Sequence, residues 1–296
     1  MSLVINHNMM AMNAARNLGT SYSRLATSTE RLSSGLRINR SADDAAGLAI
    51  RELMRAEIAG MNQGIRNAND AISLIQTADG ALQIIDEKLI RMKELAEQAA
   101  TGTYNSDQRL MIESEYQQMA SEITRIAMAT DFGGLHLLDG TLTGTHDGSG
   151  IMQKGALKIH FGTGNSSAED YYYIEIGCAT ASALGLGNNS TPDDPGFTIS
   201  TQEAAQKSLD ALNEAIISKD KIRAHLGAMQ NRLENTVSNL QIMAENLQAA
   251  ESRISDVDVA TEMTEFVRNQ ILTQAAVAML SQANSLPQMA MQLIQG

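Results

Sequence analysis

The sequence predicts a mainly α protein in which both chain ends form a long antiparallel helical bundle or coiled coil, with a small β-hairpin-rich insert between them. Apolar residues repeat with heptad spacing along both arms of the chain. The first 191 residues contain no proline that would break a helix. Thirteen of the 22 glycines lie between positions 131 and 200, so a turn-rich middle separates two helical arms.

The first arm is predicted to contain three helices. Their apolar repeats cover about 11–36, 54–99 and 112–126. In the second helix the alternation of four- and three-residue steps runs to Ile75 and resumes at Ala78 in a shifted phase. Such a shift should disturb a supercoil locally.

The second arm carries the clearest heptad pattern. From Ile222 to Val257 the steps alternate between four and three, and ten of the eleven positions are apolar. A capping box at 200–203 predicts where this helix begins. Such a helix cannot be stable alone, so we expect it to pack against 45–100 and 106–129. The predicted bundle seam comprises Ile58, Ile65, Ile72, Leu226, Leu233, Leu240 and Leu247.

The insert is predicted to form short strands. Apolar and polar residues alternate at 157–161 and at 172–176, and 197–199 is a third candidate. A small, hairpin-like piece follows from this pattern.

Both chain ends lack charged side chains. Asp, Glu, Lys and Arg are absent from 1–15 and from 269–296, although 19% of the chain is charged. A soluble helix normally carries charges on its wet face, so both ends are predicted to pack against other protein surfaces and to be disordered in a lone monomer. Six glutamines in the last stretch disfavour membrane insertion. The predicted self-assembly residues are Leu18, Leu25, Leu32, Val267, Ile271, Ala275 and Leu280.

The bulk composition excludes several classes of partner. A net charge of −12 and a pI near 4.9 argue against binding to nucleic acid or anionic lipid. Cys178 is the single cysteine, which rules out an internal disulfide and a cysteine-based zinc cluster. The amino terminus has no basic region before its apolar residues, so a Sec-type signal peptide is not expected.

The chemical motifs in the chain do not predict an enzyme, a cofactor or a metal site. The sequence has no His-Glu-x-x-His, no Walker loop and no Gly-x-Ser-x-Gly, and 131–133 matches only three residues of a kinase motif. His146 and Asp147 could bind a metal, but a plain loop is the better interpretation. Arg37, Arg40 and Arg51 surround a pair of aspartates, which favours a salt-bridged bend over an anion site. Only an enzyme site without a recognisable motif would escape these tests.

Long motifs at both ends resemble bacterial flagellins. The stretch 36–50, LRINRSADDAAGLAI, is similar to the amino-terminal flagellin signature. On the carboxyl side, 223–240 resembles the flagellin coiled-coil segment, and 252–263 with 274–284 resembles the terminal signature. The resemblance covers about 1–140 and 197–296, and it fails in the insert.

The resemblance implies a structural subunit that assembles into the helical, extracellular filament of a bacterial flagellum for swimming motility. By position, 1–40 and 258–296 would pair in the filament core. The bundle domain would comprise 41–140 and 197–257, with 141–196 as a short variable insert.

The resemblance also implies partners. These are further copies of the chain, the hook–filament junction protein, the filament cap protein, the flagellin export chaperone and the export apparatus. Residues 89–95 are similar to the flagellin stretch bound by the vertebrate Toll-like flagellin receptor. The matching contact residues are Arg91 and Leu95, with Glu115 on the next helix. Ile90 replaces the polar residue common there.

Two other structural proteins remain as alternatives. A hook–filament junction protein resembles flagellin at both ends, although the matches along the central arms favour flagellin. A signalling coiled coil, such as a chemoreceptor hairpin, would lack a strand-rich insert at mid-chain.

Overall fold

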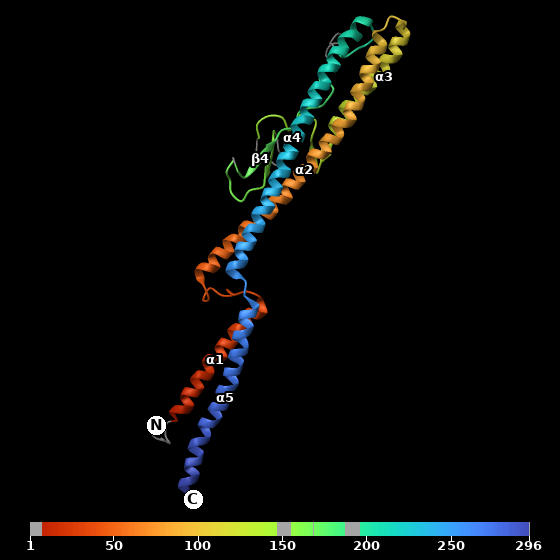
Figure 1. The fold of residues 1–296 in the computed structure, drawn as a ribbon. Coiled ribbons are helices and arrows are strands. Elements are labelled where there is room, and N and C mark those ends of the chain that lie inside the picture. The colour runs from red at the N-terminus through yellow and green to blue at the C-terminus, as the bar shows by residue number, and fades with distance from the viewer. Residues whose placement is uncertain (1–7, 147–154, 168, 187–195, 296) are drawn as a thin grey trace. The chain divides into compact units, whose positions relative to one another are not determined.

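The computed structural model describes residues 8–146, 155–167, 169–186 and 196–295, and these are mainly helical (Figure 1), as predicted. Consecutive strands pair into two antiparallel hairpins. The helices are α1 (Met9–Ser34), α2 (Ala45–Ala100), α3 (Ser106–Ala129), α4 (Gln202–Ser255) and α5 (Val259–Gln295), and the strands are β1 (Asp131–Phe132), β2 (Leu135–His136), β3 (Leu157–His160) and β4 (Tyr171–Ile174).

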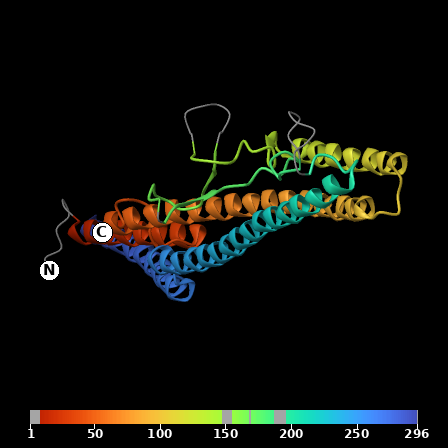
Figure 2. The same ribbon diagram turned by 90° about the horizontal axis from the view of Figure 1, so that it is seen from above.

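The chain divides into two compact units, and the first unit contains residues from both chain ends. It comprises 1–58 and 245–296, and the second unit comprises 59–244. These limits differ from the predicted division into end pair, bundle and insert. Residues 41–58 and 245–257 lie in the first unit, and the insert belongs to the second, where it lies along α2 and α4 (Figure 2).

The bend between α1 and α2 is held by side-chain bonds to the backbone and by ion pairs. The guanidinium of Arg51 is buried, and its Nη1 donates to the carbonyl of Ile38 at 2.8 Å. The carboxylate of Asp43 accepts the backbone N–H groups of Asn39 and Arg40 at 3.1 and 3.0 Å. These two bonds lower the pKa of Asp43. The bend is salt-bridged as predicted, but Arg40 and Arg51 pair with Glu30 and Glu52 at 2.9 and 2.8 Å, while Asp43 orders the backbone.

The second unit is built on an uninterrupted row of buried side chains along α2. Buried positions alternate steps of three and four from Met61 to Ala99, so the predicted shift in the middle of the helix is absent. Gly64 and Ala71 occupy two of these positions. A Cβ at Gly64 would lie 2.0 Å from the carbonyl oxygen of Phe161 in the insert. Small residues therefore belong to the core here, because they make room for the insert backbone.

Helix α4 presents a matching row of buried positions. This row runs with heptad spacing from Ala205 to Ala244. The predicted capping box at 200–203 is not formed. The hydroxyl of Thr201, not that of Ser200, accepts the N–H of Ala204 at 3.2 Å, and an alanine has no polar side chain to complete a box. The two rows share one apolar core with α3 and the insert.

Two ion pairs join α2 to α4 beside this core. The ammonium of Lys219, with 2% of its side chain exposed, lies 2.5 Å from Asp86. The guanidinium of Arg223 lies 2.7 Å from Asp79 and lowers the pKa of that carboxyl through its hydrogen bonds. A buried charge without its partner is costly, so we infer that these pairs select which heptads of the two helices face each other.

The β1–β2 hairpin is absent from the predicted elements, although its turn has a sequence signal. Gly133 and Gly134 lie between the strands with φ of 61° and 87°. A two-residue turn of this kind needs positive φ at both positions, which glycine adopts without strain. Strands β3 and β4 agree with two of the predicted strands and pair Leu157 with Ile174.

The predicted strand at 197–199 is wrong. This segment is irregular and bonds to α3. The hydroxyl of Thr198 donates to Glu113 at 2.8 Å, and the hydroxyl of Tyr116 donates to the carbonyl of Gly196 at 2.7 Å. The side chains of Tyr116 and Gln117 donate to the carbonyls of Gly196 and Phe197, which are backbone groups that a neighbouring strand would otherwise satisfy.

Two adjacent isoleucines test the assignment of the α2 core row. Ile85 is fully buried, whereas Ile84 is 48% exposed. We expect Ile85→Ala to lower the free energy of unfolding of the second unit by about 2–5 kcal/mol, through lost burial and a cavity. Ile84→Ala should cost less than about 1 kcal/mol. Urea unfolding followed by circular dichroism measures both, and equal losses would contradict the assignment.

Candidate interaction surface on the terminal helices

Helices α1 and α5 lie antiparallel within the first unit (Figure 1). Near one end, the side-chain amide of Asn8 donates to the carbonyl of Ala283 at 2.7 Å. Further along, Arg31 and Glu262 form an ion pair at 3.6 Å. Beyond α1, Leu36 forms an isolated antiparallel bridge with Asp256.

Both helices have well-defined amino-terminal caps. The side chain of Asn8 accepts the N–H of Ala11 at 3.0 Å at the start of α1. Asp258 precedes α5 and accepts the N–H groups of Ala260 and Thr261, together with the Thr261 hydroxyl. The hydroxyl and N–H of Thr261 lower the pKa of Asp258, so this cap is ionised at neutral pH.

The seam between α1 and α5 consists of small, polar and a few large side chains. The less exposed positions of each helix repeat with heptad spacing, which is the pattern of a two-stranded coiled coil. Only Ser28, Asn269 and Ala283 are fully buried among the described side chains of the two helices. The α1 positions are Ala11, Ala14, Leu18, Ser21, Leu25, Ser28 and Leu32, and the α5 positions are Glu262, Phe266, Asn269, Thr273, Ala276, Leu280 and Ala283.

Two buried polar atoms weaken this seam further. The Oδ1 of Asn269 and the Nε of Arg31 are buried and have no hydrogen-bond partner among the described residues. An unsatisfied buried polar group costs about 1–3 kcal/mol. With few large side chains buried to offset that cost, the α1–α5 pair is marginal by itself.

The outer faces of α1 and α5 expose many large apolar side chains. These helices hold twelve of the twenty-three exposed large apolar residues in the described part of the chain. The five exposed glutamines on α5 supply polar groups without charge. We call these twelve residues the outer apolar surface; they are Met9, Met10, Met12, Tyr22, Val259, Met263, Val267, Ile271, Leu272, Val277, Met279 and Met289.

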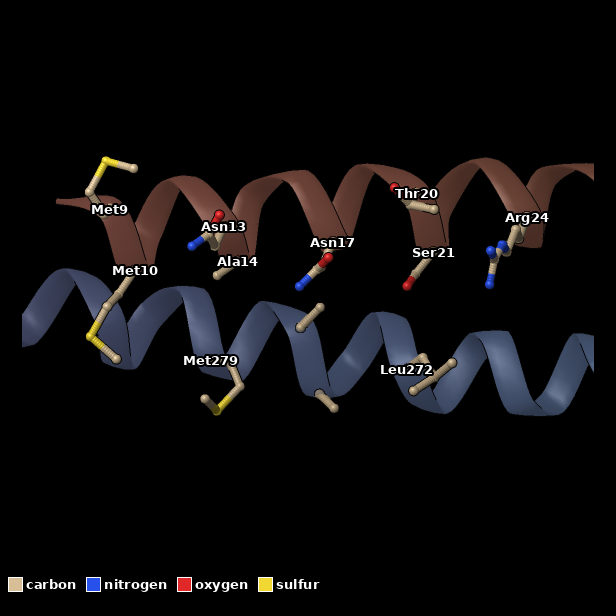
Figure 3. A pocket seen from close by; sticks show the side chains of 12 residues that line it. Met9, Met10, Asn13, Ala14, Asn17, Thr20, Ser21, Arg24, Leu272 and Met279 are labelled. Atoms are coloured by element: carbon tan, nitrogen blue, oxygen red, sulfur yellow. The ribbon is translucent and has the colours of Figure 1, made fainter. Parts of the chain in front are cut away.

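A groove of about 650 Å³ lies between the two helices and continues this surface (Figure 3). Met10 reaches from α1 across α5, and Leu272 contributes apolar surface from the other side. Asn17 and Arg24 point from α1 toward α5. Apart from Arg24, the groove is lined by methionine, leucine, alanine and uncharged polar groups, so it fits an apolar side chain from another helix.

The predicted self-assembly residues fall on two different faces. Leu18, Leu25, Leu32 and Leu280 are half-buried in the seam between α1 and α5. Val267 and Ile271 are 44% and 59% exposed, and Ala275 is also exposed; all three belong to the outward side of α5. The sequence pattern placed these residues in one set because heptad spacing alone does not distinguish the two faces.

The predicted bundle seam is also divided between two levels of burial. On α2 the buried row passes through Gly64 and Ala71, which are the neighbours of the predicted Ile65 and Ile72. Leu226, Leu233 and Leu240 are buried, whereas Ile58, Ile65, Ile72 and Leu247 are half-buried.

The residues predicted to contact an innate receptor form a charged surface of the second unit. Arg91 bonds to Glu115 on α3 and to Glu94, both at 2.9 Å, and these carboxylates raise its pKa. Leu95 is only 2% exposed. This leucine can therefore only support the surface from within, and the direct contacts fall to Arg91 and Glu115.

Neither a metal-binding group nor a membrane-spanning helix is found in the part of the chain that the structure describes. Its residues include no group of three or more His, Cys, Asp and Glu side chains placed to hold a metal ion. Asp147, considered with His146 as a metal ligand, lies outside the described residues. None of the described helices is long and apolar enough to cross a membrane.

Known proteins similar to this chain match almost all of it. The family models of the bacterial flagellin N-terminal and C-terminal helical regions match residues 5–143 and 209–294. Flagellin of Halalkalibacterium halodurans is 44% identical over 292 residues, covering 99% of this chain and 100% of that protein. Flagellin FlaB1 of Treponema pallidum is 42% identical over 283 residues, or 96% of each chain. Flagellin of Bacillus subtilis is 42% identical over 301 residues, covering 98% and 99%.

A solved structure agrees with the fold. A putative flagellar hook-associated protein from Vibrio parahaemolyticus covers 72% of this chain and 100% of its own, with a TM-score of 0.56. Its sequence is 14% identical, so this likeness concerns the fold alone.

Limited proteolysis of the unassembled chain tests whether the terminal pair is marginal. Because the α1–α5 seam buries little, we expect a non-specific protease to cleave first within α1 and α5 and to leave a fragment close to 59–244. Mass spectrometry of the early products identifies the cleavage sites. Protection of α1 and α5 equal to that of the second unit would contradict this expectation.

Proposed function

The chain belongs to the bacterial flagellin family and is a subunit of the flagellar filament, and we propose that α1 and α5 form the part of the subunit that neighbouring copies enclose. In this proposal 1–40 and 258–296 pair in the filament core. Residues 41–140 and 197–257 form the helical bundle domain, and 141–196 is the short variable insert.

The observation that carries this proposal is the outer apolar surface on α1 and α5. Nothing within the described first unit covers it, and no charged residue follows Arg268. Large exposed apolar patches mark interaction sites in soluble proteins. A single type of subunit encloses such a surface by repeated head-to-tail contacts, which give an open helical polymer when they do not close into a ring.

The two faces of the terminal pair then have separate roles. Leu18, Leu25, Leu32 and Leu280 hold α1 against α5 within one subunit. Val267, Ile271 and Ala275 contact neighbouring subunits. Because the seam is marginal, the pair gains most of its stability only when the neighbours bury its outer surface, so folding of the ends is coupled to polymerisation.

A filament subunit of this kind acts outside the cell. We place the assembled chain in the extracellular filament, reached through the flagellar export apparatus with an export chaperone. The hook–filament junction protein and the filament cap protein would contact the two ends of the polymer. These partners follow from the family and from the unprotected terminal helices, which would aggregate before assembly without a partner.

The hook–filament junction protein is not favoured as an identity for this chain. Relatives that match 96% or more of it at 42–44% identity are named flagellin or flagellar filament core protein. Flagellins are a structural protein family, which fits the absence of enzyme motifs in the sequence.

A second proposed role concerns the surface of Arg91 and Glu115. We propose that a vertebrate Toll-like flagellin receptor reads this pair when the subunit is free. Both side chains are more than 40% exposed, so a partner can reach them. Leu95 keeps α2 packed beneath them.

Seeded growth of the full-length chain tests the assembly proposal. Ile271→Glu should abolish elongation, because it places a charge in a surface that neighbours bury. Ile271→Val should elongate nearly normally, and a chain ending before Asn269 should not elongate. Electron microscopy and sedimentation of polymer measure the outcome. Normal filaments from the glutamate variant or the truncated chain would refute the proposal.

A receptor reporter assay tests the second role. Arg91→Ala should reduce signalling about tenfold or more, because an exposed arginine with charged neighbours is a typical interface contact. Arg125→Ala is the matched control. Arg125 lies on α3 and, like Arg91, is an exposed arginine bonded to a glutamate, in this case Glu122. Equal potency of the Arg91 variant and the wild type would remove the receptor assignment.

A further inference from the structure

One side chain at the start of α1 makes two bonds of different kinds. The Oδ1 of Asn8 accepts the N–H of Ala11 and so caps α1. Its Nδ2 donates to the carbonyl of Ala283 in α5, 275 residues away in the sequence, at 2.7 Å. Serine or aspartate would cap the helix equally well, but an ionised aspartate cannot donate, and serine has a single oxygen on a shorter side chain for both bonds. Asparagine carries the acceptor and the donor on two separate atoms.

The carbonyl that receives this second bond is free because of a proline. In an α-helix the carbonyl of residue 283 accepts from the N–H of residue 287. Residue 287 is Pro287, which lies inside α5 and has no N–H. The carbonyl of Ala283 would therefore lack its helical partner, and Asn8 supplies the donor from the opposite helix.

Between its two ends, the seam does little to fix how α1 and α5 align. The seam between them is rich in small side chains, which would fit nearly as well after a slip of one heptad. Arg31 and Glu262 are separated by 3.6 Å, and the arginine side chain is 31% exposed. At the far end the alignment is set by backbone bonds, from Arg37 to Ser255 and from Val257 to Gly35. The bond from Asn8 is the matching attachment at the opposite end.

We infer that Asn8 is a positioning residue for filament assembly, and that Pro287 creates the acceptor which Asn8 needs. Together they fix the register of α1 on α5 and so determine which apolar side chains the outer surface presents. The inference rests on the proposed function of that surface. It gives Pro287, which lies within α5, the role of leaving the carbonyl of Ala283 free for Asn8.

A double-mutant cycle in the full-length chain tests this inference. Asn8→Ser keeps the cap acceptor and adds no charge, but it removes the amide donor. We expect it to raise the critical concentration for seeded filament growth roughly three- to tenfold, the loss typical of one hydrogen bond to an otherwise unpaired carbonyl. Asn8→Asp should give at least the same loss, because its carboxylate would face the carbonyl.

The decisive comparison uses Pro287→Ala as a second background. The alanine restores an N–H at 287, which satisfies the carbonyl of Ala283 within α5. Asn8→Ser should then raise the critical concentration less than twofold relative to Pro287→Ala alone. The same loss in both backgrounds, or none in either, would overturn the inference. Failure of the wild-type chain to elongate under the same conditions would instead count against the proposed function.

Discussion

The structure depends on apolar surface that one copy of the chain cannot bury. Most of the large apolar side chains of α5 face outward, while the fully enclosed positions of the seam against α1 hold small or polar residues such as Ser28 and Asn269. A helix pair arranged in this way gains little from folding alone. Its outer side chains stabilise the pair only when neighbouring copies of the chain bury them. The hydrophobic core of the chain ends is therefore complete only when other copies of the chain bury their outer apolar surface.

The second unit follows the opposite rule. Its buried rows on α2 and α4 are enclosed within one chain, and the insert fills the remaining side of the core. Glycine at position 64 allows the backbone of the insert to approach α2 closely. This unit can therefore be stable in a free subunit, and we expect it to survive when the ends do not. Division into a self-sufficient part and a dependent part suits a protein that must exist first as a monomer and later as a polymer.

The sequence predicted the helical arms and the two strands at 157–161 and 172–176, because each depends on local periodicity or composition. Features set by tertiary contacts were harder to predict. The α2 row was misplaced because Gly64 was not counted as a core residue, and the strand at 197–199 failed because its polar groups bond to α3. The pairing of Asn8 with Ala283 could not be derived from spacing, since 275 residues separate them. The sequence does show, through Pro287, that the carbonyl of residue 283 lacks its helical donor.

The ion pairs between α2 and α4 have a mechanical consequence. A seam of similar aliphatic side chains resists separation of the helices but offers little resistance to axial sliding. After a shift of one heptad, each side chain packs again between similar side chains of the facing helix. Sliding would remove Lys219 from Asp86 and Arg223 from Asp79, and would leave the buried lysine with only Asp220 of its own helix as a partner. Under bending or torsional load, these charged contacts set the stiffness of the subunit along its length, whereas the apolar core holds the helices together sideways.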